Sequence, residues 1–216
     1  MTTILGIEIE HLPHAAVRVT LPDERVLYFD PFKLAMNYRD AAMVFISHEH
    51  FDHCSIEDLK KICTPQTVVF CPADCQNKLS SLTLKHVTLV RPGQKIKIGE
   101  ILIETVPAYN TNKKFHLKEQ EWVGYIVTVP GAEGPKRVYH CGDTDYIPEM
   151  NQLKDIDIAC MGVGGTYGMT AEEAAKAVNS FKPKVAIPMH YGVIVGTPED
   201  GKRFKELVQH SRVEVI

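Results

Sequence analysis

Short apolar runs, many of them alternating with polar residues, occupy most of the first half of the chain. Such alternation is typical of β-strands with one buried face. Turn-forming residues separate several runs, as at 21–25 and 91–94. We therefore predict strands over residues 4–10, 15–20, 26–30, 43–47, 67–71, 87–89, 95–98 and 101–106.

Capping patterns mark the starts of two helices. Ser55 is followed three residues later by Asp58, a spacing that lets a side-chain oxygen accept a hydrogen bond from the first helical turn. Thr170 is followed in the same way by Glu173. A third helix is predicted over residues 200–209, and further strands over 122–129, 137–141 and 185–189. Strands interleaved with helices predict an α/β chain whose sheets are covered by helices.

The composition is that of a folded protein, with 216 residues of which 44% are hydrophobic and 24% charged. No repeat or linker divides the chain, so we expect one domain over residues 1–216. The formal net charge of −3 disfavours a nucleic-acid partner. Six dispersed cysteines favour a reducing compartment, and no basic leader or apolar stretch of about 18 residues is present. We therefore expect a cytoplasmic protein without a membrane segment.

The densest chemistry lies between a predicted strand and a predicted helix. The sequence Ser-His-Glu-His-Phe-Asp-His there contains four candidate metal ligands, His48, His50, Asp52 and His53. Side chains of an extended segment alternate in direction, so His48 and His50 point to the same side and can bind one ion. Asp52 and His53 come from a different direction as the chain turns into the helix, which suits a second ion nearby.

A metal site explains this cluster better than a purely structural role. Ionisable groups this close together would repel one another, and burying them without a cation would cost desolvation free energy. Glu49 and Phe51 alternate with the candidate ligands. We expect these two side chains to point away from the metal, and either to pack or to support the ligands.

The motif matches in full the H-x-H-x-D-H signature of the metallo-β-lactamase superfamily, which this sequence resembles. Three further segments follow the order of that superfamily: Asp30-Pro31 before the motif, and Gly142-Asp143 and Pro188-Met-His190 at the ends of predicted strands. The sequence looks most like the compact lactonase-like branch, which includes ascorbate phosphate lactonase and many metal-dependent hydrolases. N-acyl-phosphatidylethanolamine phospholipase D is a larger relative of this branch.

The resemblance implies a four-layer αββα sandwich in which each half of the chain supplies one sheet and its helices, with a metal cleft along one edge. It implies that His48 and His50 bind a first metal and that Asp143 bridges to a second. The ligands of the second metal would be Asp52, His53 and His190. Two Zn²⁺ ions are expected, with Mn²⁺ or Fe²⁺ as alternatives.

The sequence departs from the superfamily pattern at the third histidine of the first metal, expected shortly after residues 101–106. Asn110 stands near that place, and its neutral amide oxygen is a poor zinc ligand compared with imidazole. His116, six residues further on, either folds back into the site or is a surface histidine. Whether the first ion is bound tightly or loosely depends on which alternative holds.

Four other residues are candidates for the site. His14 resembles a histidine of a Gly-His-Ala segment near the cleft of related hydrolases, while a core or turn role fits it equally well. His140 adjoins Gly142-Asp143 and is predicted to orient a ligand through a hydrogen bond. Thr166 and Tyr167 lie in a glycine-rich turn before a helix, and they become substrate contacts if that turn borders the cleft.

These features predict a hydrolase whose ions lower the pKa of a bound water from near 16 toward about 7, giving a metal-bound hydroxide. Asp52 would orient this nucleophile, and His116 is a candidate acid for the leaving group. The expected substrate is a small molecule, with an ester or lactone favoured over a phosphodiester. The alternative is a metal-binding sensor or scaffold without turnover, supported by the missing third histidine. The sequence carries no signal for the oligomeric state.

Overall fold

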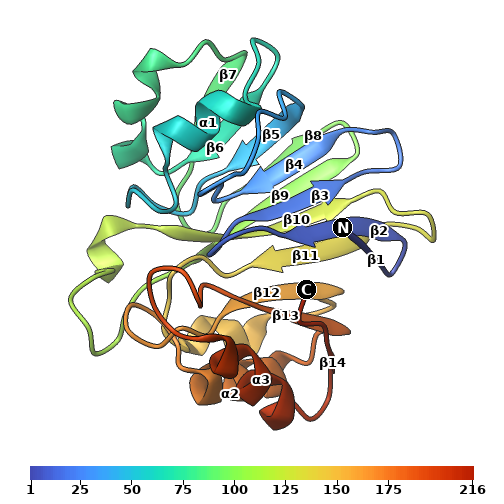
Figure 1. Cartoon of the computed structure of the whole chain (residues 1–216), viewed down its shortest axis with the longest axis vertical. Coiled ribbons are helices and arrows are strands. Elements are labelled where there is room, and N and C mark those ends of the chain that lie inside the picture. Colours follow the sequence, from blue (N-terminus) through green and yellow to red (C-terminus); the bar gives the residue numbers. More distant parts are fainter.

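Strands from the two halves of the chain form two separate seven-stranded sheets (Figure 1). The structure, a computed structural model, describes residues 1–216. The first sheet contains β1 (Thr2–Ile4), β2 (Ile7–His11), β3 (Val17–Thr20), β4 (Val26–Phe29), β5 (Ala41–Phe45), β6 (Val68–Cys71) and β7 (His86–Leu89). The second contains β8 (Lys95–Ile98), β9 (Ile101–Pro107), β10 (Val123–Val129), β11 (Lys136–His140), β12 (Ile158–Gly162), β13 (Val185–Met189) and β14 (Arg212–Val213).

Three α-helices and four short 3-10 helices connect the strands. They are α1 (Ile56–Ile62), α2 (Ala171–Phe181), α3 (Pro198–Leu207), η1 (Ala73–Cys75), η2 (Lys78–Ser81), η3 (Lys118–Gln120) and η4 (Pro148–Gln152). Ser55 caps α1 by accepting the backbone N–H of Asp58, and Thr170 caps α2 in a reciprocal pair with Glu173. Both predicted helix starts are therefore confirmed. None of the helices combines the length and apolarity needed to cross a lipid bilayer.

Strand order within each sheet follows the order of the strands in the chain. From β1 to β4 neighbouring strands are antiparallel, and from β4 to β7 they are parallel. The second sheet repeats this scheme, with antiparallel pairing from β8 to β11 and parallel pairing from β11 to β14. Carboxyl ends of parallel strands meet at one edge of a sheet, so the loops that follow β4 and β5, and those that follow β11 and β13, are neighbours.

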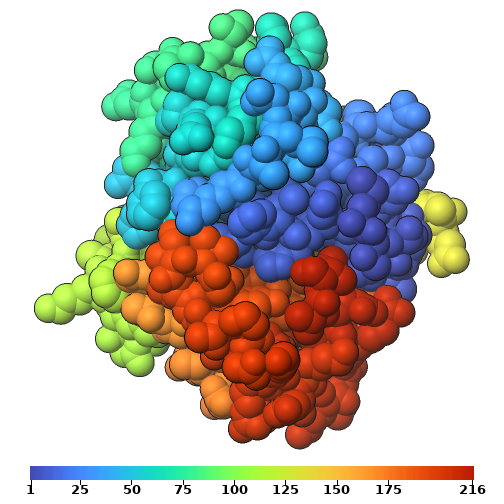
Figure 2. All heavy atoms as spheres, in the orientation of Figure 1, coloured from blue at the N-terminus to red at the C-terminus, as the bar shows by residue number.

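The two sheets pack face to face over a shared core of 45 buried residues, which includes Phe45 from the first sheet and Tyr125 from the second. A second cluster of 14 buried residues lies between the first sheet and α1, and α2 and α3 cover the second sheet (Figure 1). Figure 2 shows the first part of the chain, in blue and green, above the orange and red C-terminal part. The predicted four-layer αββα sandwich is therefore confirmed.

The prediction of the strands fails at three places, one of which is the two-residue strand β14, which has no counterpart among the predicted strands. Residues 4–10 form a hairpin instead of one strand, because Leu5 and Gly6 turn the chain with φ angles of 51° and 77°. β12 has no counterpart among the predicted strands. Residues 158–161 are all buried, so this central strand shows a continuous apolar run without the alternation that marks a half-exposed strand.

Asp58 ties α1 to the loop after β4. Its carboxylate accepts the backbone N–H groups of Lys33 and Leu34, both at 2.9 Å, and contacts Lys61 at 2.9 Å. Burial alone would raise the pKa of Asp58, but hydrogen bonds from Lys61 and Ser55 hold it below its ordinary value. The stability from this carboxylate is therefore present above the unfolded-state pKa of about 4 and is lost as pH falls through the lower folded-state pKa.

Replacing Asp58 by alanine is expected to lower the free energy of unfolding by about 2–4 kcal/mol at pH 7, because two amides and Lys61 lose their acceptor. Urea denaturation measures the change. The matched control is Glu57→Ala, which removes a neighbouring side chain that is 84% exposed. That variant is expected to change stability by less than about 0.5 kcal/mol. Equal losses in the two variants would show that Asp58 does not hold the loop.

Candidate metal centre

The buried carboxylate of Asp30, directly after β4, fixes the loop between β5 and α1. Its Oδ1 accepts the backbone N–H of Ser47 at 2.7 Å, and its Oδ2 accepts the Ser47 hydroxyl at 2.6 Å. The same Oδ2 lies 2.7 Å from Nδ1 of His53. Asp30 therefore anchors both ends of the histidine motif and leaves Nε2 of His53 facing the interior of the site.

His48, His50 and His116 form the first group of nitrogen donors, all within 4.8 Å of one another. His48 Nε2 and His50 Nδ1 are 3.0 Å apart, and the ring centroid of His116 lies 5.0 Å from those of the other two. The Trp122 ring packs against all three, with centroids at 4.7, 4.9 and 5.4 Å. His48 and His50 come from the first half of the chain, whereas His116 comes from the loop between β9 and η3.

Asn110 holds His116 in this place. Asn110 Oδ1 accepts the backbone N–H of His116 at 3.1 Å and lies 3.0 Å from its Nδ1. The Asn110 amide donates to Asp145 at 3.0 Å and to the carbonyl of Tyr167 at 2.9 Å. His116 is 1% exposed, so the alternative of a surface histidine is wrong. Asn110 occupies the expected position of the third histidine but supports the histidine that stands in for it.

His14, Asp52, His53 and His190 form the second group of donors. His14 Nε2 lies 2.9 Å from Asp52 Oδ2, and the His14 ring contacts the His190 ring at a tilt of 38°, with centroids 3.8 Å apart. His53 Nε2 lies 3.7 Å from the same Asp52 oxygen. His14 is therefore a buried part of the site, in direct contact with two predicted ligands, and the alternative of a plain turn residue does not describe it.

The Asp143 carboxylate lies between the two groups. Its Oδ2 is 3.3 Å from Nε2 of His116, in the first group. Its Oδ1 is 3.1 Å from Nε2 of His190 and 3.4 Å from Nε2 of His53, both in the second group. The two oxygens of one carboxylate thus face different sets of imidazoles.

Electrostatics separate the charged members of the site from the neutral ones. Burial would raise the pKa of Asp143, but His190 and His53 hold it well below its ordinary value. Burial would lower the pKa of His53, but Asp143 and Asp30 raise it well above its ordinary value. Burial lowers the pKa values of His48 and His50, and neighbouring histidines lower them further. These two rings are therefore neutral at pH 7, the form in which imidazole binds a metal.

The side chains of the site fit a cation. Nε2 of His53, His116 and His190 is buried and has no hydrogen-bond partner, although each of these atoms approaches Asp143 within 3.4 Å. Buried polar atoms are nearly always satisfied, so each such nitrogen calls for an explanation. A divalent cation between the imidazoles and the carboxylate would satisfy them all, because it would accept the lone pairs of the nitrogens, displacing the proton where a ring carries one, and would neutralise the buried charge.

Three other predicted residues border the site without joining either group. His140 Nε2 lies 2.8 Å from the Ala15 carbonyl, and its Nδ1 accepts the Gly142 N–H at 3.3 Å, so it supports the backbone beside His14 and Asp143. Tyr167 contributes its carbonyl to Asn110 and His116, and Thr166 is exposed beside it. The glycine-rich turn therefore does border the site.

Phe51 and Glu49 behave differently from each other. Glu49 points away from the site, as expected, and pairs with Lys78 at 3.0 Å. Phe51 is 69% exposed, so the expectation that it packs is wrong. Its ring forms a T-shaped pair with Phe32, with centroids 5.9 Å apart.

Three residues of the site have no signal in the sequence. Trp122 was expected only as the first residue of a strand, yet its indole N–H donates to Asp74 at 2.6 Å and its ring covers the first group. Ser47 and Asp145 act through contacts with Asp30 and Asn110, which lie 17 and 35 residues away in the chain. Local pattern does not reveal such distant pairs.

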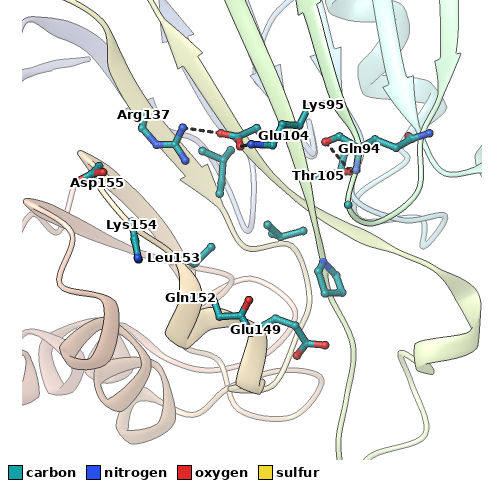
Figure 3. A pocket seen from close by; sticks show the side chains of 14 residues that line it. Gln94, Lys95, Glu104, Thr105, Arg137, Glu149, Gln152, Leu153, Lys154 and Asp155 are labelled. Carbon is teal, nitrogen blue, oxygen red and sulfur yellow. Dashed lines mark hydrogen bonds and ion pairs between the residues drawn. The ribbon is translucent and has the colours of Figure 1, made fainter.

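A cavity of about 510 Å³ lies away from these groups, on the outer face of the second sheet (Figure 3). An ion pair between Arg137 and Glu104, with N–O distance 2.6 Å, runs along its wall, and Glu149 and Gln152 of η4 border it. No member of either donor group lines this cavity. The candidate metal centre is therefore not in this cavity.

Comparisons with known proteins agree with the arrangement. The profile described as "Beta-lactamase superfamily domain" matches residues 8–190. A UPF0173 metal-dependent hydrolase of Methanopyrus kandleri is 32% identical, over 94% of this chain and 92% of the relative. A UPF0173 protein of Pyrococcus abyssi is 32% identical over 80% and 76% of the two chains. A solved structure from Parabacteroides distasonis, assigned to the metal-dependent hydrolases, has a TM-score of 0.80 and 32% identity and covers 96% of this chain and 92% of its own.

Adding Zn²⁺ to chelator-treated protein is expected to raise the unfolding temperature by about 5–15 °C, since an ion at 100 or more times its Kd binds the folded state alone. Thermal unfolding followed by circular dichroism measures the shift. His190→Ala is expected to lose at least half of it. His86→Ala, which removes an exposed histidine of β7, is the control and is expected to keep it. A full shift in His190→Ala would contradict the assignment of this group as a metal centre.

Proposed function

The chain belongs to the β-lactamase superfamily and is a metal-dependent hydrolase, and from this premise we propose that it holds two zinc ions and hydrolyses a small-molecule ester, lactone or phosphodiester. One observation carries the proposal. The buried Nε2 atoms of His53, His116 and His190 surround the Asp143 carboxylate and have no hydrogen-bond partner. Nitrogen atoms arranged in this way are suited to bind a cation as ligands.

The first ion is assigned to His48, His50 and His116, and the second to Asp52, His53 and His190, with Asp143 between the two. The two carboxylate oxygens of Asp143 face different groups, Oδ2 the first and Oδ1 the second. This supports two bound ions over one. His14 is assigned to the support of Asp52, since its Nε2 already lies 2.9 Å from Asp52 Oδ2.

Zinc suits this set of donors. Imidazole nitrogens with one or two carboxylates are ligands that Zn²⁺ binds with ordinary affinity, whereas Mn²⁺ prefers oxygen donors. Fe²⁺ also accepts histidine and carboxylate ligands. Metal analysis of the protein, together with activity restored by single metals after chelation, distinguishes the three, and restoration by Fe²⁺ alone would contradict zinc.

Bound zinc ions would supply Lewis acidity, which lowers the pKa of water toward neutrality and polarises the bond under attack. The chain's own residues orient the reactants. Asp52, held by His14, presents a carboxylate that can position a nucleophilic water by hydrogen bonding. Trp122 covers one side of the first group and excludes bulk water there.

Once bound to a metal through Nε2, His116 would have no free proton to offer a leaving group. Its Nδ1 is engaged by Asn110, and its Nε2 faces Asp143 within the donor group. A histidine that binds a metal through Nε2 keeps no proton on that atom. We therefore assign His116 to ligation, and its candidate role as the acid for the leaving group is withdrawn.

The proposed substrate is a small molecule in the cytoplasm. All six cysteines are free, as befits a reducing compartment. The net charge of −3 gives no general attraction for polynucleotides. Esters, lactones and phosphodiesters share a centre that a water-derived nucleophile attacks with loss of an oxygen leaving group, so one constellation of donors serves all three.

The alternative function, a metal-binding sensor or scaffold without turnover, loses its main support. That support was the missing third histidine of the first group. His116 lies with His48 and His50 in the first group and is held by Asn110, which supports a full set of three imidazoles. A complete first group beside a complete second group favours the hydrolase.

His116→Ala is expected to reduce the bound zinc from about two ions per chain to about one and to lower kcat/KM by at least about 100-fold, because the first ion loses one of three imidazoles. Asn110→Ala is expected to weaken binding of the first ion by about 10- to 100-fold, since the ring loses its support. Elemental analysis and metal titration measure both effects, with His86→Ala as control. Two tightly bound ions in His116→Ala would contradict the assignment.

A further inference from the structure

Large apolar side chains are exposed mainly beside the candidate ligands. Nine are exposed in the whole chain, and five of them lie within four residues of His50, His116 or His190. These five are Phe51 (69% exposed), Phe115 (46%), Leu117 (46%), Val193 (37%) and Ile194 (37%). Isolated exposed apolar residues need no explanation, but a group of them around one site marks a binding surface.

Two phenylalanines flank the donor groups on different sides. Phe51 meets Phe32 edge to face, and Phe32 in turn lies 5.7 Å from the His14 ring, beside the second group. Phe115 meets Tyr167 edge to face with centroids 4.8 Å apart. The Tyr167 carbonyl lies 3.1 Å from His116 Nδ1, beside the first group.

Val193 and Ile194 lie in the loop 191–196, which follows His190. This loop interlocks with the glycine-rich turn, since a side chain on Gly164 would clash with the His190 carbonyl and with Val195. In Figures 1 and 2 the orange-red segment after β13 lies beside the blue and cyan loops after β4 and β5. We call these five residues, Phe51, Phe115, Leu117, Val193 and Ile194, the apolar rim, because they come from three loops that frame one site.

Positive charge is sparse among the same loops. No arginine occurs in residues 30–36, 47–54, 108–117, 142–147, 163–170 or 190–196. Of the lysines there, Lys113 is already paired with Asp145, and Lys33 and Lys114 are exposed. Recognition of a phosphate monoester or another strongly anionic group normally uses arginine forks or several lysines. The loops are thus suited to an uncharged apolar group and poorly suited to a phosphorylated one.

We propose that the apolar rim binds the hydrocarbon part of the substrate, so that the substrate class is an ester or lactone with an acyl or alkyl chain. This inference rests on the proposed hydrolase function and names its substrate. Removing apolar surface from water stabilises the complex in proportion to the area covered. Each fully buried methylene is expected to raise the affinity about fourfold. A partly open rim is expected to give about a two- to fourfold gain for each methylene.

Binding can be followed without turnover through the only tryptophan of the chain, Trp122, whose ring packs on the first donor group. Zinc-loaded protein is titrated with butanoate, hexanoate, octanoate and decanoate, and the Kd of each is read from tryptophan emission and confirmed by calorimetry. The expected result is a Kd that falls about two- to fourfold with each added methylene. A Kd independent of chain length would overturn the proposal.

Variants of the rim residues test whether the dependence of Kd on chain length arises at the apolar rim. Phe115→Ser and Phe51→Ser are each expected to weaken decanoate binding by about 5- to 20-fold and to affect butanoate least, because a short chain does not reach the rim. Phe51 lies within the histidine motif, so if Phe51→Ser disturbs metal binding, Phe115→Ser alone tests the proposal. Leu89→Ser is the matched control, since Leu89 is 40% exposed on the edge strand β7. Equal losses for Leu89→Ser and Phe115→Ser would overturn the assignment.

Turnover distinguishes this inference from the function on which it rests. Rates with p-nitrophenyl esters of the same chain lengths are expected to give a kcat/KM that rises in parallel with affinity. Chain-length-dependent binding without hydrolysis of any ester or lactone would contradict the hydrolase and leave the rim in place. Hydrolysis whose rate does not depend on chain length would support the hydrolase and contradict the role of the rim. Sedimentation with phosphatidylcholine vesicles, combined with a flat Kd series, would identify a lipid surface as the occupant and overturn the proposal.

Discussion

The buried Asp143 carboxylate and the imidazole nitrogens that face it are the constraint on which the rest of the site depends. A buried charge is tolerated only where other charges and hydrogen bonds compensate it. Here hydrogen bonds act on the outer side of two of these rings: Asp30 holds His53, and Asn110 holds His116. The inner nitrogens are left without partners and converge on the carboxylate. The hydrogen bonds therefore orient the rings, and a bound metal would compensate the buried charge of the carboxylate.

This arrangement requires both halves of the chain. The first donor group takes His48 and His50 from the first half and His116 from the second, and the second group is completed by His190. The halves meet directly below the motif, where the Tyr125 hydroxyl of β10 donates to the carbonyl of Ile46 at 2.8 Å. Because ligands come from both sheets, the donor groups form only when the sheets pack, and metal binding is coupled to the stability of the interface between them.

Features that depend on neighbours in the sequence could be predicted, and features that depend on distant contacts could not. The starts of α1 and α2 follow from capping spacings of three residues, and the motif follows from side-chain alternation, so both are local. The position of His116 depends on Asn110, which is itself tied to Asp145, 35 residues away. Because β12 is buried on both faces, its sequence shows no alternation of polar and apolar residues by which it could be predicted. The hairpin at Leu5 and Gly6 depends on backbone angles that the apolar pattern does not encode.

Under the proposed function, the reaction and the selectivity for substrate would be carried by side chains of opposite character. His48, His53 and His116 are at most 1% exposed and are fixed by packing or by hydrogen bonds on their outer sides, which suits a geometry that must stay constant. Phe51 and Phe115 are 69% and 46% exposed, and each meets one aromatic neighbour edge to face. A substitution among these exposed residues costs little stability and leaves the donor groups intact. Such loops can change substrate while the fold and the metal chemistry persist, so a relative that is 32% identical can share the centre without sharing the substrate.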